Sequence, residues 1–284
     1  MVHPTDESHP MSPEEAQRQC LGEIARRAIL AQDRHAEAAR LVRHGAKCFS
    51  QGDEDGIIAE IFRRIGPRHR TFVEFGAGNG LENNTAHLLL QGWRGAWIDG
   101  DPANVEIIRG KYRHYLEAGR LVAAETLLLP DNVDRAVASL GVTGAIDLLS
   151  VDVDGNDLAL IEALECVRPR VVVAEYNARY GASVRWRMPF DAGHRWDGTE
   201  HFGASLAELA DVMDRRGFAL VGCNLVGTNA FFVARDEDLA AFRAPFTAEE
   251  HFEPARYYLL PWHGGHPVDA RADRPFPLVA VAGA

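Results

Sequence analysis

The residues best suited to chemistry form two groups, and each follows an apolar run. In the first, Glu74-Phe-Gly-Ala-Gly-Asn-Gly80, a carboxylate precedes three alternating glycines. Glycines at the end of a strand let a ligand approach the main chain closely. A dinucleotide site spaces its glycines G-x-G-x-x-G, but here Leu81 stands where the third glycine would be. The turn therefore fits a nicotinamide cofactor poorly.

A second acid, Asp99, ends the next apolar run. An acid at this position can accept hydrogen bonds from both hydroxyls of a ribose. Glu74 offers a negative charge that suits an amino group better than a pyrophosphate. Tight packing alone would explain the glycines, but it leaves both acids without a role. The combination favours S-adenosylmethionine, a nucleoside with a cationic amino-acid end.

The second group is an acidic run, Asp152-Val-Asp-Gly-Asn-Asp157, together with Glu175-Tyr-Asn177 after the next apolar run. Adjacent strand ends would bring these oxygens together, where their charges repel unless a cation or protons intervene. Hard oxygen ligands select Mg²⁺ or Ca²⁺ over zinc. The glycine stands fourth in the run and Ala163 twelfth, which excludes an EF-hand. We expect a bound divalent ion; the alternative is that Asp152 and Asp154 cap the following helix.

The first group, with Asp99, resembles the cofactor site of class I S-adenosylmethionine-dependent methyltransferases. More narrowly, the chain is similar to FkbM-type methyltransferases, many of which act on hydroxyls of sugars or natural products. The segments that carry this resemblance are Ser50-Gln-Gly-Asp-Glu-Asp-Gly56, Gly80-Leu-Glu-Asn-Asn-Thr85 and Asp147-Leu-Leu-Ser-Val-Asp-Val-Asp-Gly155, within residues 48–235. The resemblance implies cofactor contacts as follows: Glu74 at the methionine end, Gly76 and Gly78 at the backbone approach, Thr85 at the carboxylate and Asp99 at the ribose.

The acidic group is similar to the site of metal-dependent O-methyltransferases such as catechol O-methyltransferase. That resemblance implies Asp152 and Glu175 as metal ligands. Tyr176 stands where those enzymes have an amide, so the third ligand is Asn177, one residue later, or Asp154. A metal ion that holds a substrate hydroxyl lowers the pKa of that hydroxyl and orients its oxygen. A carboxylate or a histidine nearby would then take the proton.

The stretch 178–203 has no helix or strand periodicity, and it is rich in Trp, His, Arg and Gly. Its length indicates a lid or substrate loop. Its aromatic faces would stack on sugar rings or aryl groups. We predict His201 as the proton acceptor, with Asp152 and Asp154 as the carboxylates of the catalytic set. His194 is the alternative proton acceptor. The simpler hypothesis is that both histidines are ordinary surface or packed residues without a catalytic role.

The elements that must position these residues alternate strands and helices. Strands are expected near 71–75, 95–99, 121–124, 146–152 and 171–175, which predicts a parallel sheet with helices on both faces. Two further strands, 218–222 and 229–234, are joined so closely around Gly227 that they must be antiparallel. We predict a Rossmann-like, doubly wound α/β fold with a mostly parallel seven-stranded sheet and a terminal antiparallel strand.

Capping signals mark the helices. Ser12 with Glu15 begins one that continues to a stop at Gly45, and Asp53 caps a second that ends at Gly66. Ser205 and Glu208 form another capping box. The domains expected are a flexible N-terminus and helical extension (1–47), a methyltransferase domain (48–245) and a C-terminal tail that packs on it (246–284).

The composition limits the partners. Acidic residues outnumber basic ones 41 to 30, for a net charge of −11, which argues against nucleic acid and anionic membranes. No apolar run approaches the ~20 residues of a membrane span, and the first residues do not resemble a secretory signal. Four scattered cysteines indicate neither a disulfide framework nor a zinc site. We therefore expect a cytoplasmic protein, and the amphipathic first helix permits a homodimer.

The predicted function is Mg²⁺-assisted O-methylation by S-adenosylmethionine of a sugar, oligosaccharide or related natural product. A phenolic or polyketide hydroxyl fits almost as well. One alternative is a glycosyltransferase that uses Asp152-Val-Asp154 as a D-x-D motif, but this leaves Glu74 unexplained. Another is a non-catalytic binding module that keeps the cofactor fold and docks partners on its first helix.

Overall fold

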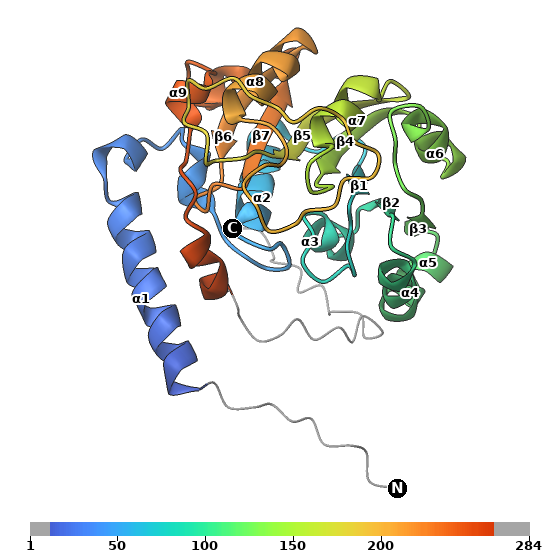
Figure 1. Ribbon diagram of the computed structural model, residues 1–284, viewed down its shortest axis with the longest axis horizontal. Coiled ribbons are helices and arrows are strands. Elements are labelled where there is room, and N and C mark those ends of the chain that lie inside the picture. The colour runs from blue at the N-terminus through green and yellow to red at the C-terminus, as the bar shows by residue number, and fades with distance from the viewer. Residues whose placement is uncertain (1–11, 264–284) are drawn as a thin grey trace, which may run out of the picture.

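The computed structural model describes residues 12–263, and these build one seven-stranded sheet with helices on both faces (Figure 1). The strand order is β3-β2-β1-β4-β5-β7-β6. Its strands are β1 (Thr71–Phe75), β2 (Arg94–Asp99), β3 (Leu121–Glu125), β4 (Gly144–Val151), β5 (Val167–Glu175), β6 (Phe218–Cys223) and β7 (Asn229–Ala234). Strand β7 is antiparallel to both of its neighbours, while the other pairs are parallel. The predicted Rossmann-like α/β fold is confirmed.

The central strands are buried on both faces, which explains their continuous apolar sequence. In β5, Val172 and Ala174 belong to the core on one face of the sheet, whereas Val171 and Val173 belong to the core on the other. The first core is covered by α6 (Val133–Ser139), α7 (Asp157–Ala163) and α8 (Leu206–Arg215). The second is covered by α2 (Glu54–Ile65), α3 (Ala86–Leu90), α4 (Pro102–Lys111) and α5 (Arg113–Glu117). The alternation of side chains along each strand thus separates the two cores.

The first helix is shorter than predicted. Helix α1 (Pro13–Leu30) is followed by two 3-10 turns, η1 (Asp33–His35) and η2 (Leu41–His44), where the sequence indicated helix up to Gly45. The cause is a long-range contact: His35 is fully buried, and its Nε2 lies 2.8 Å from Glu253 Oε1. This contact turns the chain back onto the body, while α1 itself lies at the periphery (Figure 1).

Two of the predicted caps were tested by the structure, with different results. Ser205 Oγ accepts a hydrogen bond from the Glu208 amide at the start of α8, as predicted. Asp53 precedes α2 but does not cap it, because its carboxylate accepts a hydrogen bond from the Leu225 amide instead. Gly66, with φ at +69°, ends α2 as predicted.

The C-terminal part of the chain continues from β7 into η3 (Leu239–Ala241), α9 (Ala248–His251) and η4 (Tyr257–His263). Part of the predicted tail therefore packs on the domain, and Tyr176 donates a hydrogen bond to the Glu253 carbonyl oxygen at 2.6 Å. Residues 1–11 and 264–284, which the sequence assigned to the flexible N-terminus and the tail, lie outside the described residues. Within 12–263, no helix combines the length and apolar character needed to cross a bilayer.

The parallel strands direct the predicted site residues to one edge of the sheet. Glu74 on β1 is in register with Trp97 on β2 and with Ser150 on β4. Consequently the carboxyl ends of β1, β2, β4 and β5 meet, and the segments that follow them face one another. In open α/β sheets, this edge is where ligands bind.

Candidate functional site

The glycine turn after β1 combines close packing with an open position. Gly76, Gly78 and Gly80 all have positive φ, at +73°, +52° and +77°. A Cβ at Gly76 would lie 1.6 Å from the carbonyl oxygen of Asp152, and one at Gly80 would lie 2.9 Å from the Tyr112 ring. A Cβ at Gly78 would meet nothing within 4 Å. Gly76 and Gly80 are therefore required by packing, whereas the main chain at Gly78 is open to a ligand.

Asp99 fixes this turn from the end of β2. Its Oδ2 accepts a hydrogen bond from the Gly78 amide at 2.8 Å. Its Oδ1 accepts from the Asp101 amide at 2.8 Å and from Asn104 Nδ2 at 3.1 Å. Oδ2 thus retains a lone pair beside the open main chain of Gly78. That arrangement suits a ligand hydroxyl, as expected for a ribose.

Glu74 and Thr85 support the neighbouring turn and are themselves buried. Glu74 accepts hydrogen bonds from Asn83 Nδ2, from the amides of Asn84 and Thr85, and from Thr85 Oγ1 at 2.5 Å. Thr85 Oγ1 in turn accepts from Trp97 Nε1 at 2.7 Å. The sequence assigned both side chains direct contacts with a cofactor, but in the structure these groups are engaged in holding residues 83–85. Three of the four donors converge on Oε2, whereas Oε1 accepts only from the Asn84 amide and retains a lone pair, so contact of Glu74 with a cofactor stays a prediction.

Burial also affects the charge of Glu74. Removal from water raises the pKa of this carboxyl to about 7, although the four hydrogen bonds lower it in part. Asn83, beside it, has a buried Oδ1 with no hydrogen-bond partner among the described residues. Asn83 Oδ1 is thus an unfilled acceptor beside Glu74, and sequence reasoning missed it although it lies within the segment 80–85 that carried the resemblance.

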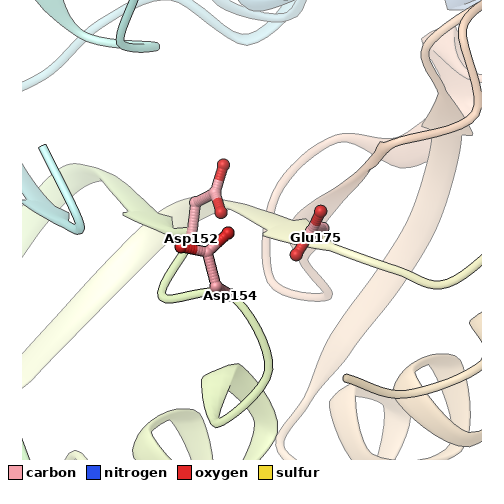
Figure 2. Close-up of side chains that lie close together, drawn as sticks. All are labelled: Asp152, Asp154 and Glu175. Atoms are coloured by element: carbon pink, nitrogen blue, oxygen red, sulfur yellow. The ribbon is translucent and has the colours of Figure 1, made fainter. Parts of the chain in front are cut away.

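Three carboxylates converge at the ends of β4 and β5. One oxygen from each of Asp152, Asp154 and Glu175 lies within 4.8 Å of the others (Figure 2). No donor from residues 12–263 forms a hydrogen bond with any of the three side chains, and Glu175 Oε2 is buried without a partner. Grouped carboxylates that lack donors repel one another unless protons or a cation neutralise them. Their oxygens are the ligand type that Mg²⁺ and Ca²⁺ prefer.

The electrostatics of this acidic triad agree with its geometry. Burial raises the pKa of Asp152 well above its usual value, and repulsion from Asp157 and Asp154 adds to the rise. Burial and repulsion from Asp152 raise the pKa of Glu175 in the same way. The pKa of Asp154 is also raised by burial, while His194 acts in the opposite direction. The triad therefore holds protons at pH values where ordinary carboxyls are ionised.

The capping alternative for Asp152 and Asp154 is wrong, because Asp157 bonds the turn itself. Asp157 Oδ1 accepts from the Val153 amide and its Oδ2 from the Gly155 amide, both at 2.9 Å. Asp154 has φ at +57°, a left-handed conformation that few residues other than glycine adopt. The two acids are thus presented by the turn and are not used to hold it.

Asn177, predicted as the third metal ligand, belongs to the base of the loop instead. Its Nδ2 donates to the carbonyl oxygens of Glu200 and Phe202, at 2.9 and 3.1 Å. Its Oδ1 accepts from the Arg179 amide at 3.1 Å. Asn177 therefore ties together the two ends of the loop 178–203, and Asp154 takes its predicted place in the acidic group.

The loop 178–203 contacts the acidic turn through His194 and not through His201. His194 Nε2 lies 2.9 Å from the carbonyl oxygen of Asp154. Asn156 and Asp191 form a reciprocal pair, in which Asn156 Nδ2 donates to the Asp191 carbonyl oxygen at 2.8 Å and Asn156 Oδ1 accepts from the Asp191 amide at 3.3 Å. His201 is exposed, and its ring packs against Trp186 with centroids 5.0 Å apart. His194 is thus the histidine with a contact to the acidic turn, while His201 as proton acceptor stays a prediction.

Glu54 is a further residue whose role the sequence did not reveal. Its Oε1 accepts from Asn224 Nδ2 at 2.7 Å and from Asn229 Nδ2 at 3.0 Å, and its Oε2 accepts from the Gly52 amide at 2.8 Å. Asn229 pairs with Glu175 across β7 and β5. Glu54 thus joins the start of α2 to the strand beside the acidic triad, and its charge contributes to the raised pKa of Asp152.

Strand order, the open glycine turn and the acidic strand ends define a Rossmann-like α/β protein whose ligand edge carries carboxylates. No protein-family model matches the chain, and no curated protein matches it. Solved structures similar to it include an O-methyltransferase from Bacillus cereus in complex with SAH (15% identity, 81% of this chain and 93% of that one, TM-score 0.39). Another is an S-adenosylmethionine-dependent methyltransferase from Clostridium acetobutylicum (11% identity, 76% and 99%, TM-score 0.41).

Proposed function

We propose that the protein is an S-adenosylmethionine-dependent O-methyltransferase that uses a divalent metal ion, Mg²⁺, and acts on a sugar, oligosaccharide or related natural product. The observation that carries this proposal is the contact between two turns: the open glycine turn held by Asp99, and the donor-free acidic triad. The resemblance of segments 48–235 to FkbM-type enzymes supports the acceptor class.

The described residues fit the cofactor at three points. The main chain at Gly78 is open, Asp99 Oδ2 retains a lone pair beside it, and Asn83 Oδ1 is a buried acceptor without a donor. These would hold a nucleoside, its ribose hydroxyls and a cationic amino group. When bound, S-adenosylmethionine supplies an electrophilic methyl group on sulfur.

The acidic triad fits a divalent ion because it offers three oxygen ligands and a buried, unpartnered Glu175 Oε2. Bound Mg²⁺ supplies positive charge that lowers the pKa of an acceptor hydroxyl. Asp152 and Glu175 would hold the ion from adjacent strand ends, and Asp154 would complete the set from its strained turn. A carboxylate that stands beside the reacting hydroxyl, Asp152 or Asp154, would take the hydroxyl proton. The loop 178–203 would cover the site and exclude water.

The test is calorimetric titration of the chelator-treated protein with S-adenosylhomocysteine, repeated with excess Mg²⁺, followed by methyl-transfer assays on sugar and phenolic acceptors. We expect saturable one-site binding, and transfer that chelator abolishes and Mg²⁺ restores. Titration with a nucleotide sugar tests the D-x-D glycosyltransferase alternative, since Asp152 and Asp154 do lie together. If the nucleotide sugar binds and S-adenosylhomocysteine does not, the proposal is overturned. Binding of S-adenosylhomocysteine with no transfer to any acceptor would favour the non-catalytic module.

The expected setting of this activity is the cytoplasm, with a small-molecule or oligosaccharide acceptor and no nucleic-acid or membrane partner. A homodimer is also part of the proposal. It is supported by α1, where Leu21 and Ile24 are 57% and 64% exposed. Sedimentation of the full chain, compared with a Leu21→Ser variant, would test it.

A further inference from the structure

A second pocket lies at the opposite edge of the sheet, where the strands begin. It has a volume of about 360 Å³ and is formed by the starts of β1 and β2 and the loops that enter β3 and β4. Strand β1 runs from this pocket, at Thr71, to the glycine turn after Phe75. The pocket is therefore separate from the acidic triad and the glycine turn, and its volume lies within the range of small-molecule sites.

The pocket is cationic in a protein whose net charge is −11. Its lining includes Arg94, Arg120 and His69, and it contains no aspartate or glutamate. Within residues 12–263, neither arginine forms an ion pair. The Arg120 guanidinium donates to the carbonyl oxygens of Leu89 and Trp93 and lies 5.2 Å from the centre of the Tyr115 ring, groups outside the pocket lining, so the guanidinium that is free for a ligand is that of Arg94.

Arg94 is exposed and makes no side-chain hydrogen bond within the described part of the chain. It stands at the first position of β2, where the Arg94 amide donates to the Arg70 carbonyl oxygen at 3.0 Å. Its backbone is thus fixed while its guanidinium is free to turn toward a ligand. Guanidinium groups recognise phosphates and carboxylates through two parallel hydrogen bonds.

The hydroxyl of Thr71 is a second, independent sign of a ligand. Thr71 lines the pocket, and its Oγ1 is buried without a hydrogen-bond partner among the described residues. A buried hydroxyl without a partner is uncommon, because its desolvation is not compensated. A hydroxyl can donate to an anionic oxygen, so Thr71 matches the ligand that the arginines indicate.

The wall next to the cations is apolar and rigid. Val122, Leu140 and Val142, whose side chains are partly exposed, contribute apolar surface. The main chain at His69, on the rim of the pocket, is held in place by a hydrogen bond from its amide to Asp147 Oδ2 at 2.7 Å. Asp147 is itself paired with the buried Arg170 at 2.7 Å. A ligand that satisfies the whole pocket has an anionic head and an apolar body.

We propose that this pocket binds a small organic anion, a phosphomonoester or a carboxylate with an apolar body, at a site distinct from the proposed methyl-transfer site. The inference does not depend on the proposed function, because none of its residues lies in the glycine turn or the acidic triad. It assigns a ligand-binding site to the amino-terminal edge of the sheet.

The test is calorimetric titration of the chelator-treated full-length protein with phenyl phosphate, benzoate, inorganic phosphate and phenol. We expect one-site binding of phenyl phosphate or benzoate, at least about tenfold tighter than phenol or inorganic phosphate. The preferred head group distinguishes a phosphomonoester from a carboxylate. Inorganic phosphate that binds as tightly as phenyl phosphate would contradict the role of the apolar wall, and absence of binding by both organic anions would overturn the proposal.

Matched variants locate the binding. Arg94→Gln should weaken the binding of phenyl phosphate about tenfold, because the variant lacks the mobile guanidinium that contacts the anion. Arg113→Gln, which removes an exposed arginine of α5 outside the pocket, should leave affinity unchanged. Thr71→Val should weaken binding without loss of the fold, checked by circular dichroism. Equal affinities in the two arginine variants, or displacement of phenyl phosphate by S-adenosylhomocysteine, would show that the anion binds elsewhere.

Discussion

A Cβ atom on Gly76 would lie 1.6 Å from the main-chain carbonyl oxygen of Asp152. The turn after β1 and the turn after β4 are therefore in direct backbone contact. The Asp152 amide also donates to the Phe75 carbonyl oxygen at 3.2 Å, immediately before this contact. The two halves of the proposed site are thus joined at a point where neither backbone can move without the other.

Alanine substitutions at Gly76 and Gly78 should destabilise the fold to different extents. Gly76→Ala forces a carbon onto the Asp152 carbonyl group, and we expect destabilisation by about 3 kcal/mol or more. Gly78→Ala has space for its methyl group, so it carries only the cost of a left-handed alanine, about 1–2 kcal/mol. Urea unfolding measures both free energies of unfolding.

Gly78→Ala should nevertheless weaken the binding of S-adenosylhomocysteine roughly tenfold or more, since the methyl group occupies the space through which a nucleoside reaches the main chain. Calorimetric titration of the folded variant provides this measurement. If the Gly78 variant binds like the wild type, the cofactor does not lie over this turn. If Gly76→Ala is as stable as the wild type, the contact with Asp152 is not maintained in solution.

Asp152→Asn should remove metal binding while the fold persists. The carboxylate accepts no hydrogen bond from the described residues, so the amide breaks none, and it removes one repelling charge from the triad. We expect Mg²⁺ affinity and methyl transfer to fall by roughly 100-fold, with S-adenosylhomocysteine binding largely retained. Asp131→Asn, an exposed acid before α6, is the matched control. Unchanged transfer in Asp152→Asn would remove the metal from the mechanism.

The pH dependence of stability should reveal the buried acids. The pKa of Glu74 is about 7 in the folded chain, and those of Asp152 and Glu175 are raised well above their usual values. Near neutral pH, the native state therefore binds more protons than the unfolded state, in which ordinary carboxyls are ionised. Stability falls as pH rises under this condition, by up to about 1.4 kcal/mol per pH unit for each such group.

Thermal melts in chelator between pH 6.5 and 8 test this expectation. His251, whose pKa burial lowers to about 4 in the folded chain, is still partly protonated near pH 6.5 when unfolded, so it opposes the fall at the lower end of this window and stops contributing toward pH 8. Excess Mg²⁺ should reduce the loss of stability with rising pH, because the ion replaces protons on the triad and binds more tightly as pH rises. A melting temperature that rises with pH in chelator, or a slope that Mg²⁺ leaves unchanged, would contradict the assignment.

The sequence predicted the strands well because apolar runs and their punctuation are local. The bounds of β1 and β7 agree with those expected, 71–75 and 229–234, since each buried strand is enclosed by turn residues. The end of α1 was not predictable in this way. It depends on the contact of His35 with Glu253, residues 218 positions apart, which no local pattern encodes.

The candidate site was likewise predictable from the sequence only in its local features. The types of residue and their strand ends indicated an acidic, nucleoside-binding edge, and the acidic convergence of Asp152 and Glu175 is present. Which oxygen is free depends on hydrogen bonds formed across the fold. Asn177 is used by its own loop and Glu74 by residues 83–85, whereas Asp154 is left exposed because Asp157 takes the turn amides.

The two histidines of the loop 178–203 should respond differently to substitution. His194 bonds the Asp154 carbonyl oxygen, so His194→Ala removes a contact that holds the loop on the acidic turn. A hydrogen bond worth about 0.5–1.5 kcal/mol changes the population of an opened loop roughly two- to tenfold. We expect trypsin to cleave within the loop, at Arg185, Arg187 or Arg195, faster by that factor in His194→Ala. His114→Ala, on the surface of α5, should cleave like the wild type. His201→Ala should retain methyl transfer within about threefold, because its ring packs on Trp186 and forms no hydrogen bond or ion pair with the acids of the described residues. A loss of 100-fold in this variant would support His201 as the proton acceptor. Equal cleavage of His194→Ala and wild type would show that other contacts close the loop.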